Sequence, residues 1–148
     1  RACPDAVFRI VGARPSPRVL ALRTLNGVEV TGAVPDIRPY LHQAAVIVAP
    51  LRIARGIQNK VLEGMAVGSP VVASPEALDG IAARVGHDIL VGDGVEDFAR
   101  AVTDVLTGRT PKSLGAAGRD FVLAHHQWTE QLRALDEIIA APLTPGSG

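Results

Sequence analysis

Short runs of β-branched residues alternate with amphipathic segments through most of the chain. Several of the runs are apolar throughout, which is typical of parallel strands covered on both faces. The segments between them carry Leu, Val or Met at helical spacing. This alternation predicts right-handed βαβ units and therefore an α/β, Rossmann-like three-layer domain with a mostly parallel sheet. The expected strands are residues 7–12, 28–32, 45–50, 70–74 and 88–93, and the expected helices between them are residues 16–26, 36–44 and 59–68.

The last third of the chain carries only helical patterns, over residues 95–108, 113–126 and 128–141. We therefore expect one Rossmann-like domain over residues 1–140 that ends in helices. Residues 141–148 are rich in Pro and Gly, and we expect them to form a disordered tail.

The charge balance and the cysteine content exclude several classes of function. Fifteen Lys and Arg against fifteen Asp and Glu give a net charge of zero, so nucleic acid and acidic membranes are not expected partners. Cys3 is the only cysteine, and no Cys or His cluster has metal-ligand spacing, so we expect neither a disulfide within the chain nor a metal. The single cysteine fits a reducing cytoplasm, and the absence of a signal-peptide pattern and of long apolar runs predicts a soluble chain.

The loop after the third expected strand is the strongest candidate for a binding site. In parallel sheets, ligands bind outside the carboxyl ends of the strands, where helix N-termini present free amides. This loop carries Arg52 and Arg55, and Gly56 permits a sharp turn before a helix that begins at Asn59. Asn59, and Asp36 in the preceding helix, have side chains suited to capping a first turn. Positive side chains and a positive helix end together predict a phosphate site.

Lys60 and Glu63 are three residues apart, so both lie near one face of the first turns of this helix. They could form a surface salt bridge. Alternatively, Glu63 could accept two hydroxyls of a vicinal diol through charge-assisted hydrogen bonds, with Lys60 against a phosphate. The spacing alone is compatible with both interpretations.

The run VTGAVPDIRPYLHQAAVIVAPLR, followed by NKVLEGMAVGSPVVAS, resembles the donor-binding C-terminal domain of a GT-B glycosyltransferase of the group 1, family 4 type. The similarity covers residues 5–130 and is strongest over residues 45–74. Within that family, the loop GIQNKVLE is most similar to bacterial sugar transferases associated with exopolysaccharide and exosortase systems. The resemblance implies half of a retaining transferase that moves a sugar from a nucleoside diphosphate to an acceptor hydroxyl without a metal or other cofactor.

The resemblance also implies roles for residues of the site. Glu63 matches the second glutamate of the family's E-x7-E motif, which receives the ribose hydroxyls. The amides of Ile57, Gln58 and Asn59 would face the diphosphate and the donor sugar. Val34 lies where the family's backbone meets the nucleobase.

Arg55 departs from the family's pattern, because it replaces the first glutamate of that motif, which usually touches the transferred sugar. Two uses follow for a planar guanidinium there. Arg55 could hold the diphosphate with Arg52 and Lys60, beside Gly56, and stabilise the leaving group. It could instead bind the carboxylate of an acidic sugar.

The chain also differs from the family in extent. The family's domain begins with a further strand, central in the sheet, and a helix, and an acceptor domain precedes it. We therefore expect an N-terminally truncated half that pairs with a missing acceptor domain and is inactive alone. Its longer parent is expected in the cytoplasm or at the inner face of the membrane. Strands 7–12 and 45–50 must then pair directly, leave a gap or recruit a strand from another copy, and we expect rearrangement or self-association.

Two other functions remain open from the sequence. A GT-B-fold sugar-nucleotide epimerase would need an acid and a base, for which Glu63, Glu76 and Asp79 are the candidates. A non-catalytic nucleotide-binding or interaction module would keep the fold without the chemistry.

Overall fold

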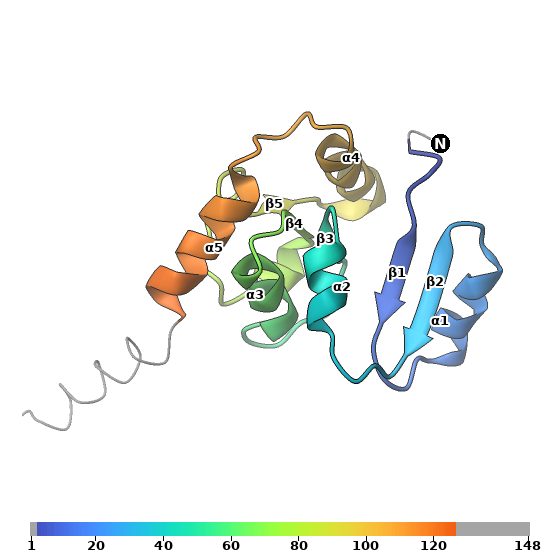
Figure 1. Cartoon of the computed structure of the whole chain (residues 1–148). Helices are drawn as coiled ribbons and strands as arrows, with labels where there is room; N and C mark the ends of the chain where they lie inside the picture. The colour runs from blue at the N-terminus through green and yellow to red at the C-terminus, as the bar shows by residue number, and fades with distance from the viewer. Residues whose placement is uncertain (1–2, 127–148) are drawn as a thin grey trace, which may run out of the picture.

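The computed structural model describes residues 3–126 and has the predicted α/β, Rossmann-like architecture (Figure 1). Each expected strand and helix within this range is present; β2 has the expected bounds, α4 begins one residue early, and the other elements are shorter than expected. The expected helix at 128–141, the tail at 141–148 and the domain end at 140 lie outside the described residues. The strands are β1 (Phe8–Val11), β2 (Val28–Gly32), β3 (Ile47–Ala49), β4 (Val71–Ala73) and β5 (Leu90–Val91). The α-helices are α1 (Pro17–Ala21), α2 (Arg38–Gln43), α3 (Asn59–Ala66), α4 (Gly94–Leu106) and α5 (Leu114–His125), and two 3-10 turns span Leu22–Thr24 and Pro75–Leu78.

The strands form two parallel sheets instead of one. β1 pairs with β2 in the first sheet, and β3, β4 and β5 pair in that order in the second. No hydrogen-bonded ladder joins β1 to β3, and β1 stands apart from the β3–β5 sheet (Figure 1). Of the three arrangements that the sequence leaves open, the structure has the gap, and the expected rearrangement of the sheet is not present among the described strands.

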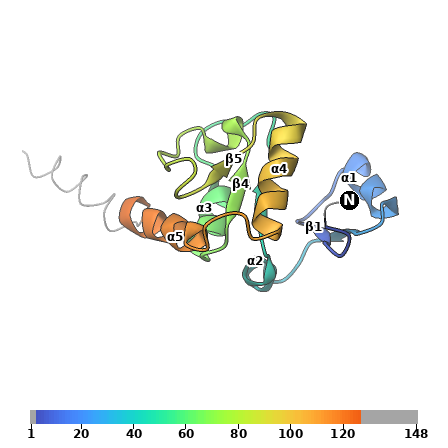
Figure 2. The same cartoon turned by 90° about the horizontal axis from the view of Figure 1, so that it is seen from above.

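The main core lies around β4, with α3 on one side and α4 on the other (Figure 2). Val61 and Met65 on α3 pack with Val71 of β4 and with Ile89, and all four side chains are fully buried. Gly64 faces the sheet, and a Cβ there would lie 3.0 Å from Cγ2 of Ile47, so its missing side chain lets α3 lie close to β3.

The β1–β2 unit (residues 8–32) is packed much less tightly than the β3–β5 unit (residues 47–125). Val30 is its only buried residue. A cross-strand ion pair, with Arg9 Nε 2.6 Å from Glu29 Oε2, joins its two strands on an exposed face. Phe8 remains 44% exposed. The two units therefore differ in how much apolar surface holds them in place.

Candidate functional site

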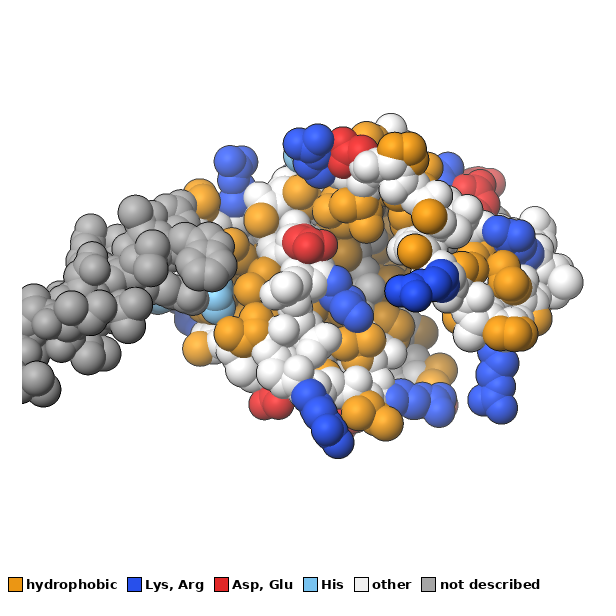
Figure 3. Space-filling view, turned by 90° about the horizontal axis from the view of Figure 1, so that it is seen from below, with side chains coloured by type: hydrophobic (Ala, Val, Ile, Leu, Met, Phe, Trp, Pro, Cys, Tyr) orange, Lys and Arg blue, Asp and Glu red, His pale blue; other side chains and the backbone are white. Residues whose placement is uncertain are grey.

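The loops after β1, β2 and β3 lie together at the lower edge of the molecule in Figure 1, where the strand arrows end. This is the carboxyl edge at which α/β folds bind ligands. Figure 3 looks onto this edge from below and shows basic side chains spread over it. The longest of these loops, residues 50–58, leads from β3 into α3.

The segment after β4 packs against this loop and stabilises it. The hydroxyl of Ser74, 8% exposed as a residue, donates a hydrogen bond of 2.6 Å to the carbonyl of Leu51. Gly80 has a φ of +76°, and a Cβ there would lie 3.3 Å from Cγ1 of Ile57. These contacts place the segment that carries Glu76 and Asp79 beside the loop.

The first turn of α3 has no side-chain cap, so the predicted capping role of Asn59 is wrong. Asn59 is already helical, and Gln58 takes the cap position with φ −89° and ψ 97°. The side-chain amide of Gln58 instead donates a hydrogen bond of 2.9 Å to the backbone carbonyl of Gly56. This contact within the loop stabilises the turn before α3. Gly56 has a φ of +67°, as a sharp turn requires.

The backbone amides of residues 57–60 have no hydrogen-bond partner within the described part of the chain. An α-helix leaves its first amides without intrahelical partners, and here no side chain supplies one. This end of α3 therefore presents free donors at the positive end of the helix dipole. The predicted cap at Asp36 is displaced by one residue: Ile37 occupies the cap position of α2 without a side-chain cap, and Asp36 Oδ1, just before it, accepts from the Arg38 amide at 2.9 Å.

The charged side chains around this turn are exposed and make no ion pair with any residue between 3 and 126. They are Arg52, Arg55, Lys60 and Glu63. The simpler interpretation of Lys60 and Glu63, a salt bridge between the two, is therefore not realised. Both groups are left available to a ligand.

Val34 lies apart from this group, in the loop that follows β2. It is half-buried, and its loop is at the same carboxyl edge as residues 50–58 (Figure 1). A ligand that spans both loops would cross from the β1–β2 unit to the β3–β5 unit.

A second polar cluster, which the sequence analysis missed, surrounds the buried carboxylate of Asp88. Asp88 accepts hydrogen bonds from the backbone amide of Arg84 at 2.9 Å and from its guanidinium Nη2 at 3.0 Å. The Nδ1 of His87 lies 2.6 Å from Asp88 Oδ1. The hydrogen bonds from Arg84 hold the pKa of Asp88 well below its usual range. The i,i+4 spacing of Arg84 and Asp88 ahead of an apolar strand was the available signal.

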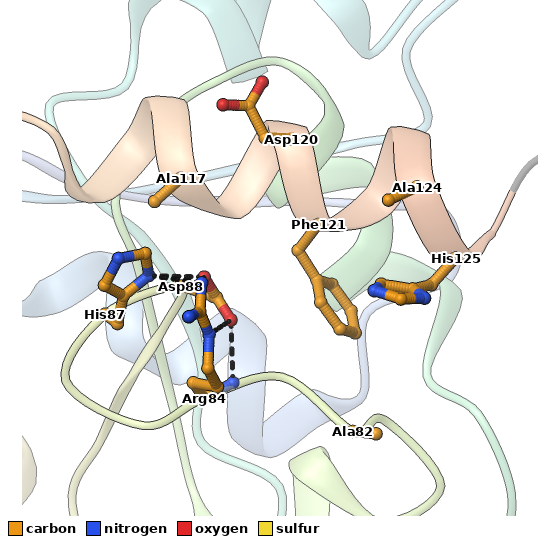
Figure 4. A pocket seen from close by; sticks show the side chains of 9 residues that line it. All are labelled: Ala82, Arg84, His87, Asp88, Ala117, Asp120, Phe121, Ala124 and His125. Carbon is orange, nitrogen blue, oxygen red and sulfur yellow. Dashed lines mark hydrogen bonds and ion pairs between the residues drawn. The ribbon is translucent and has the colours of Figure 1, made fainter.

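This cluster forms one wall of a pocket of about 360 Å³ beside the start of β5 (Figure 4). Phe121 and His125 of α5 form the opposite wall, with their ring centroids 4.9 Å apart. Asp88 stabilises the turn that leads into β5, so the cluster has a structural role.

Within residues 3–126, no group of three His, Cys, Asp or Glu side chains could hold a metal ion, and no helix is long and apolar enough to cross a membrane.

Residues 1–108 match the protein family described as Glycosyl transferases group 1. This chain belongs to that family. No curated protein matches the chain.

Three solved structures share this fold, and two of them are described as glycosyltransferases. A glycosyltransferase from Rickettsia africae ESF-5 is 17% identical with a TM-score of 0.69, over 93% of this chain and 41% of that chain. Anabaena Alr3699/HepE, solved in complex with UDP, is 14% identical with a TM-score of 0.76, over 95% and 43%. AviGT4, a glycosyltransferase of avilamycin A biosynthesis, is 23% identical with a TM-score of 0.59, over 90% and 44%. The group 1 chain thus spans less than half the length of each of these structures.

Proposed function

We propose that this chain is the nucleotide-sugar-binding half of a retaining glycosyltransferase, which transfers a sugar from a nucleoside diphosphate to an acceptor hydroxyl. One observation carries the proposal: α3 begins with amides and charged side chains that have no partner among residues 3–126, in a chain that belongs to glycosyl transferases group 1. Free amides at a helix N-terminus suit a diphosphate.

The amides of Ile57, Gln58 and Asn59 would bind the diphosphate in this proposal, and Gly56 gives their loop its turn. Glu63, which is exposed and free of ion pairs with the described residues, would accept the two ribose hydroxyls. Val34 would contact the nucleobase from the loop after β2.

Arg55 and Lys60 would stabilise the leaving group, with Arg52 adding positive charge at the loop. Bond cleavage places negative charge on the departing diphosphate, so cations fixed beside it stabilise the transition state more than the ground state. The same cations and amides would neutralise that charge without a metal or other cofactor. Arg55 could alternatively bind the carboxylate of an acidic sugar.

The acceptor site belongs, in this proposal, to another domain of a longer protein. The chain alone would then bind donor without transferring sugar, because the acceptor would not be held against the donor. The resemblance of GIQNKVLE supports a bacterial role in exopolysaccharide synthesis, in the cytoplasm or at the inner face of the membrane.

Calorimetric titration with UDP tests the proposal, since UDP is the nucleotide bound in the Anabaena structure. We expect weak binding that Glu63→Ala reduces about tenfold or more, because hydrogen bonds to a charged group contribute roughly 1.5–3 kcal/mol. Glu96→Ala is the matched control, since Glu96 is also exposed but lies on α4. Equal affinities for wild type and Glu63→Ala would reject the assignment.

A sugar-nucleotide epimerase is the second candidate, and one observation favours it. The contact of Gly80 with Ile57 brings the segment of Glu76 and Asp79 beside the donor loop, where an acid and a base would be needed. Incubation of UDP-sugars with the longer protein in the absence of acceptor separates the two. An epimerised sugar would favour the epimerase, and an unchanged sugar favours the transferase.

A further inference from the structure

We propose that Arg14 selects the nucleobase of the donor. It would favour a base that presents a carbonyl oxygen, as uracil and guanine do, over a base that presents an amino group at the same ring position, as cytosine and adenine do. This role rests on the proposed function, because Arg14 would contact the same nucleotide that the start of α3 binds. The loop GARPSP after β1, which contains Arg14, has no other role in that function.

Arg14 has a left-handed backbone conformation, with a φ of +51°. Among residues 3–126, only glycines share a positive φ with it. This conformation is disfavoured for a residue with a side chain, and Pro15 adds to the cost because a residue before proline prefers an extended backbone. Gly12 could adopt a positive φ without strain, yet it does not. The loop thus keeps a large side chain where glycine would be least strained, as occurs at ligand-binding sites.

The guanidinium of Arg14 has no partner within the described residues. Arg14 is exposed and forms no ion pair with any residue between 3 and 126. Two other arginines of this part of the molecule are paired, Arg9 with Glu29 and Arg38 with Asp36. A ligand could therefore bind Arg14 without breaking an ion pair of the described fold.

Arg14 and Val34 follow neighbouring strands at the same edge of the sheet (Figure 1). The pairing of β1 with β2 ends at the amide of Gly12, which donates to the carbonyl of Gly32 at 3.2 Å. Arg14 and Val34 each lie two residues beyond this hydrogen bond. Because adjacent strands are about 4.8 Å apart, a nucleobase in contact with Val34 would be within reach of the long side chain of Arg14.

The chemistry of a guanidinium determines which bases it can bind. It carries only N–H donors and has no acceptor. The carbonyl oxygen of uracil or guanine can accept a hydrogen bond from it, whereas the amino group of cytosine or adenine is itself a donor. An amino group facing Arg14 would leave donors unsatisfied on both sides. Arg14 therefore distinguishes the bases, although the diphosphate is the same in all nucleoside diphosphates.

Calorimetric titration of this chain with UDP, CDP, GDP and ADP tests the proposal. The wild type should bind UDP or GDP at least about tenfold more tightly than its amino counterpart, CDP or ADP, because a hydrogen bond to a charged group has an effect of this size. Arg14→Ala should bring that ratio close to one. Arg14→Gly should do the same without lowering the midpoint of thermal unfolding, because glycine relieves the strained φ. A purely structural role of Arg14 would leave the ratio unchanged.

Arg18→Ala is the matched control and should leave the ratio as it is in the wild type. Arg18 is also exposed and has no ion pair among residues 3–126, but it lies on α1.

Three results would overturn the proposal. A wild type without the expected preference in either pair would show that carbonyl bases are not selected. A preference that persists in Arg14→Ala would assign the selection to another residue. An equal fall in affinity for all four nucleotides in Arg14→Ala would place the guanidinium against the diphosphate. A wild type that binds none of the four would reject the donor site itself, and the role of Arg14 with it.

Discussion

The β1–β2 unit and the β3–β5 unit have the same parallel pairing but very different cores. In the β3–β5 unit, α3 and β4 bury Val61, Met65, Val71 and Ile89 completely. In the β1–β2 unit, only Val30 is buried. Regular pairing alone thus does not produce a stable unit, because burial of apolar surface supplies most of the free energy of folding. We expect the β1–β2 unit to open at a lower free energy than the rest.

The largest expected effect comes from the core of the β3–β5 unit. Met65→Ala should lower the free energy of unfolding by about 2–5 kcal/mol, because Met65 is only 1% exposed and its loss leaves a cavity. Ile10→Ala, in the half-buried face of β1, should cost about 1 kcal/mol. Urea unfolding of both variants measures the difference. Equal losses would show that the two units are packed alike.

A smaller loss of stability is expected on substitution of Asp88, which stabilises the turn before β5. Its folded pKa lies below its ordinary value of 3.8 because of the hydrogen bonds from Arg84. The stability that this carboxylate contributes is therefore fully present above that value and is lost as the pH falls toward the folded pKa. Asp88→Asn should lose about 1–3 kcal/mol at pH 7.

The pH dependence provides the control for this prediction. The difference between wild type and Asp88→Asn should shrink as the pH falls below about 4, because protonation removes the charge from the wild type. Unfolding by urea at a series of pH values measures it. A difference that stays constant down to low pH would contradict the assignment of the lowered pKa.

The exposed pair of Arg9 and Glu29 should contribute less still. A double-mutant cycle with Ala at both positions should give a coupling energy of about 0.2–1 kcal/mol, because both side chains are about half exposed. Added salt should reduce it. A coupling above 2 kcal/mol would show that this pair, and not apolar burial, holds the β1–β2 unit together.

The smallest effect on stability is expected at the proposed donor site. Glu63→Ala should change the free energy of unfolding by less than about 0.5 kcal/mol, since Glu63 is exposed and has no ion pair with the described residues. Thermal unfolding without ligand measures this. A large loss would mean that Glu63 supports the fold, and its effect on binding could then not be attributed to a ligand contact.

The sequence predicted the parts of the fold that local patterns determine. Apolar runs located the strands, and Leu, Val and Met at helical spacing located α3 and α4. The contact of Asp36 with the start of α2 was predictable because its carboxylate needs only the next amides of its own chain, although the cap position itself falls on Ile37. The cap at Asn59 was wrong because the conformation of the preceding glycine turn moved Gln58 into that position.

Features that depend on contacts between distant segments were not predictable from the sequence. Two contacts join segments that are far apart along the chain. Gly80 packs against Ile57, and the hydroxyl of Ser74 donates a hydrogen bond to the carbonyl of Leu51. The cluster at Asp88 was missed because its burial follows from the packing of α5 against the turn. The break in the sheet was expected from the resemblance, but which of three outcomes occurs depends on packing that no local pattern encodes.

A titration of the labelled chain with UDP, followed by NMR at single backbone amides, tests the central claim most directly. The account predicts the largest shifts at residues 57–60, with smaller ones in the loop of Val34, and none at Arg84 or Asp88. The pocket beside β5 is the internal comparison, because it also offers an arginine and histidines. Shifts centred on Arg84 and Asp88, or no shifts at residues 57–60 at saturating UDP, would contradict a donor site at the start of α3.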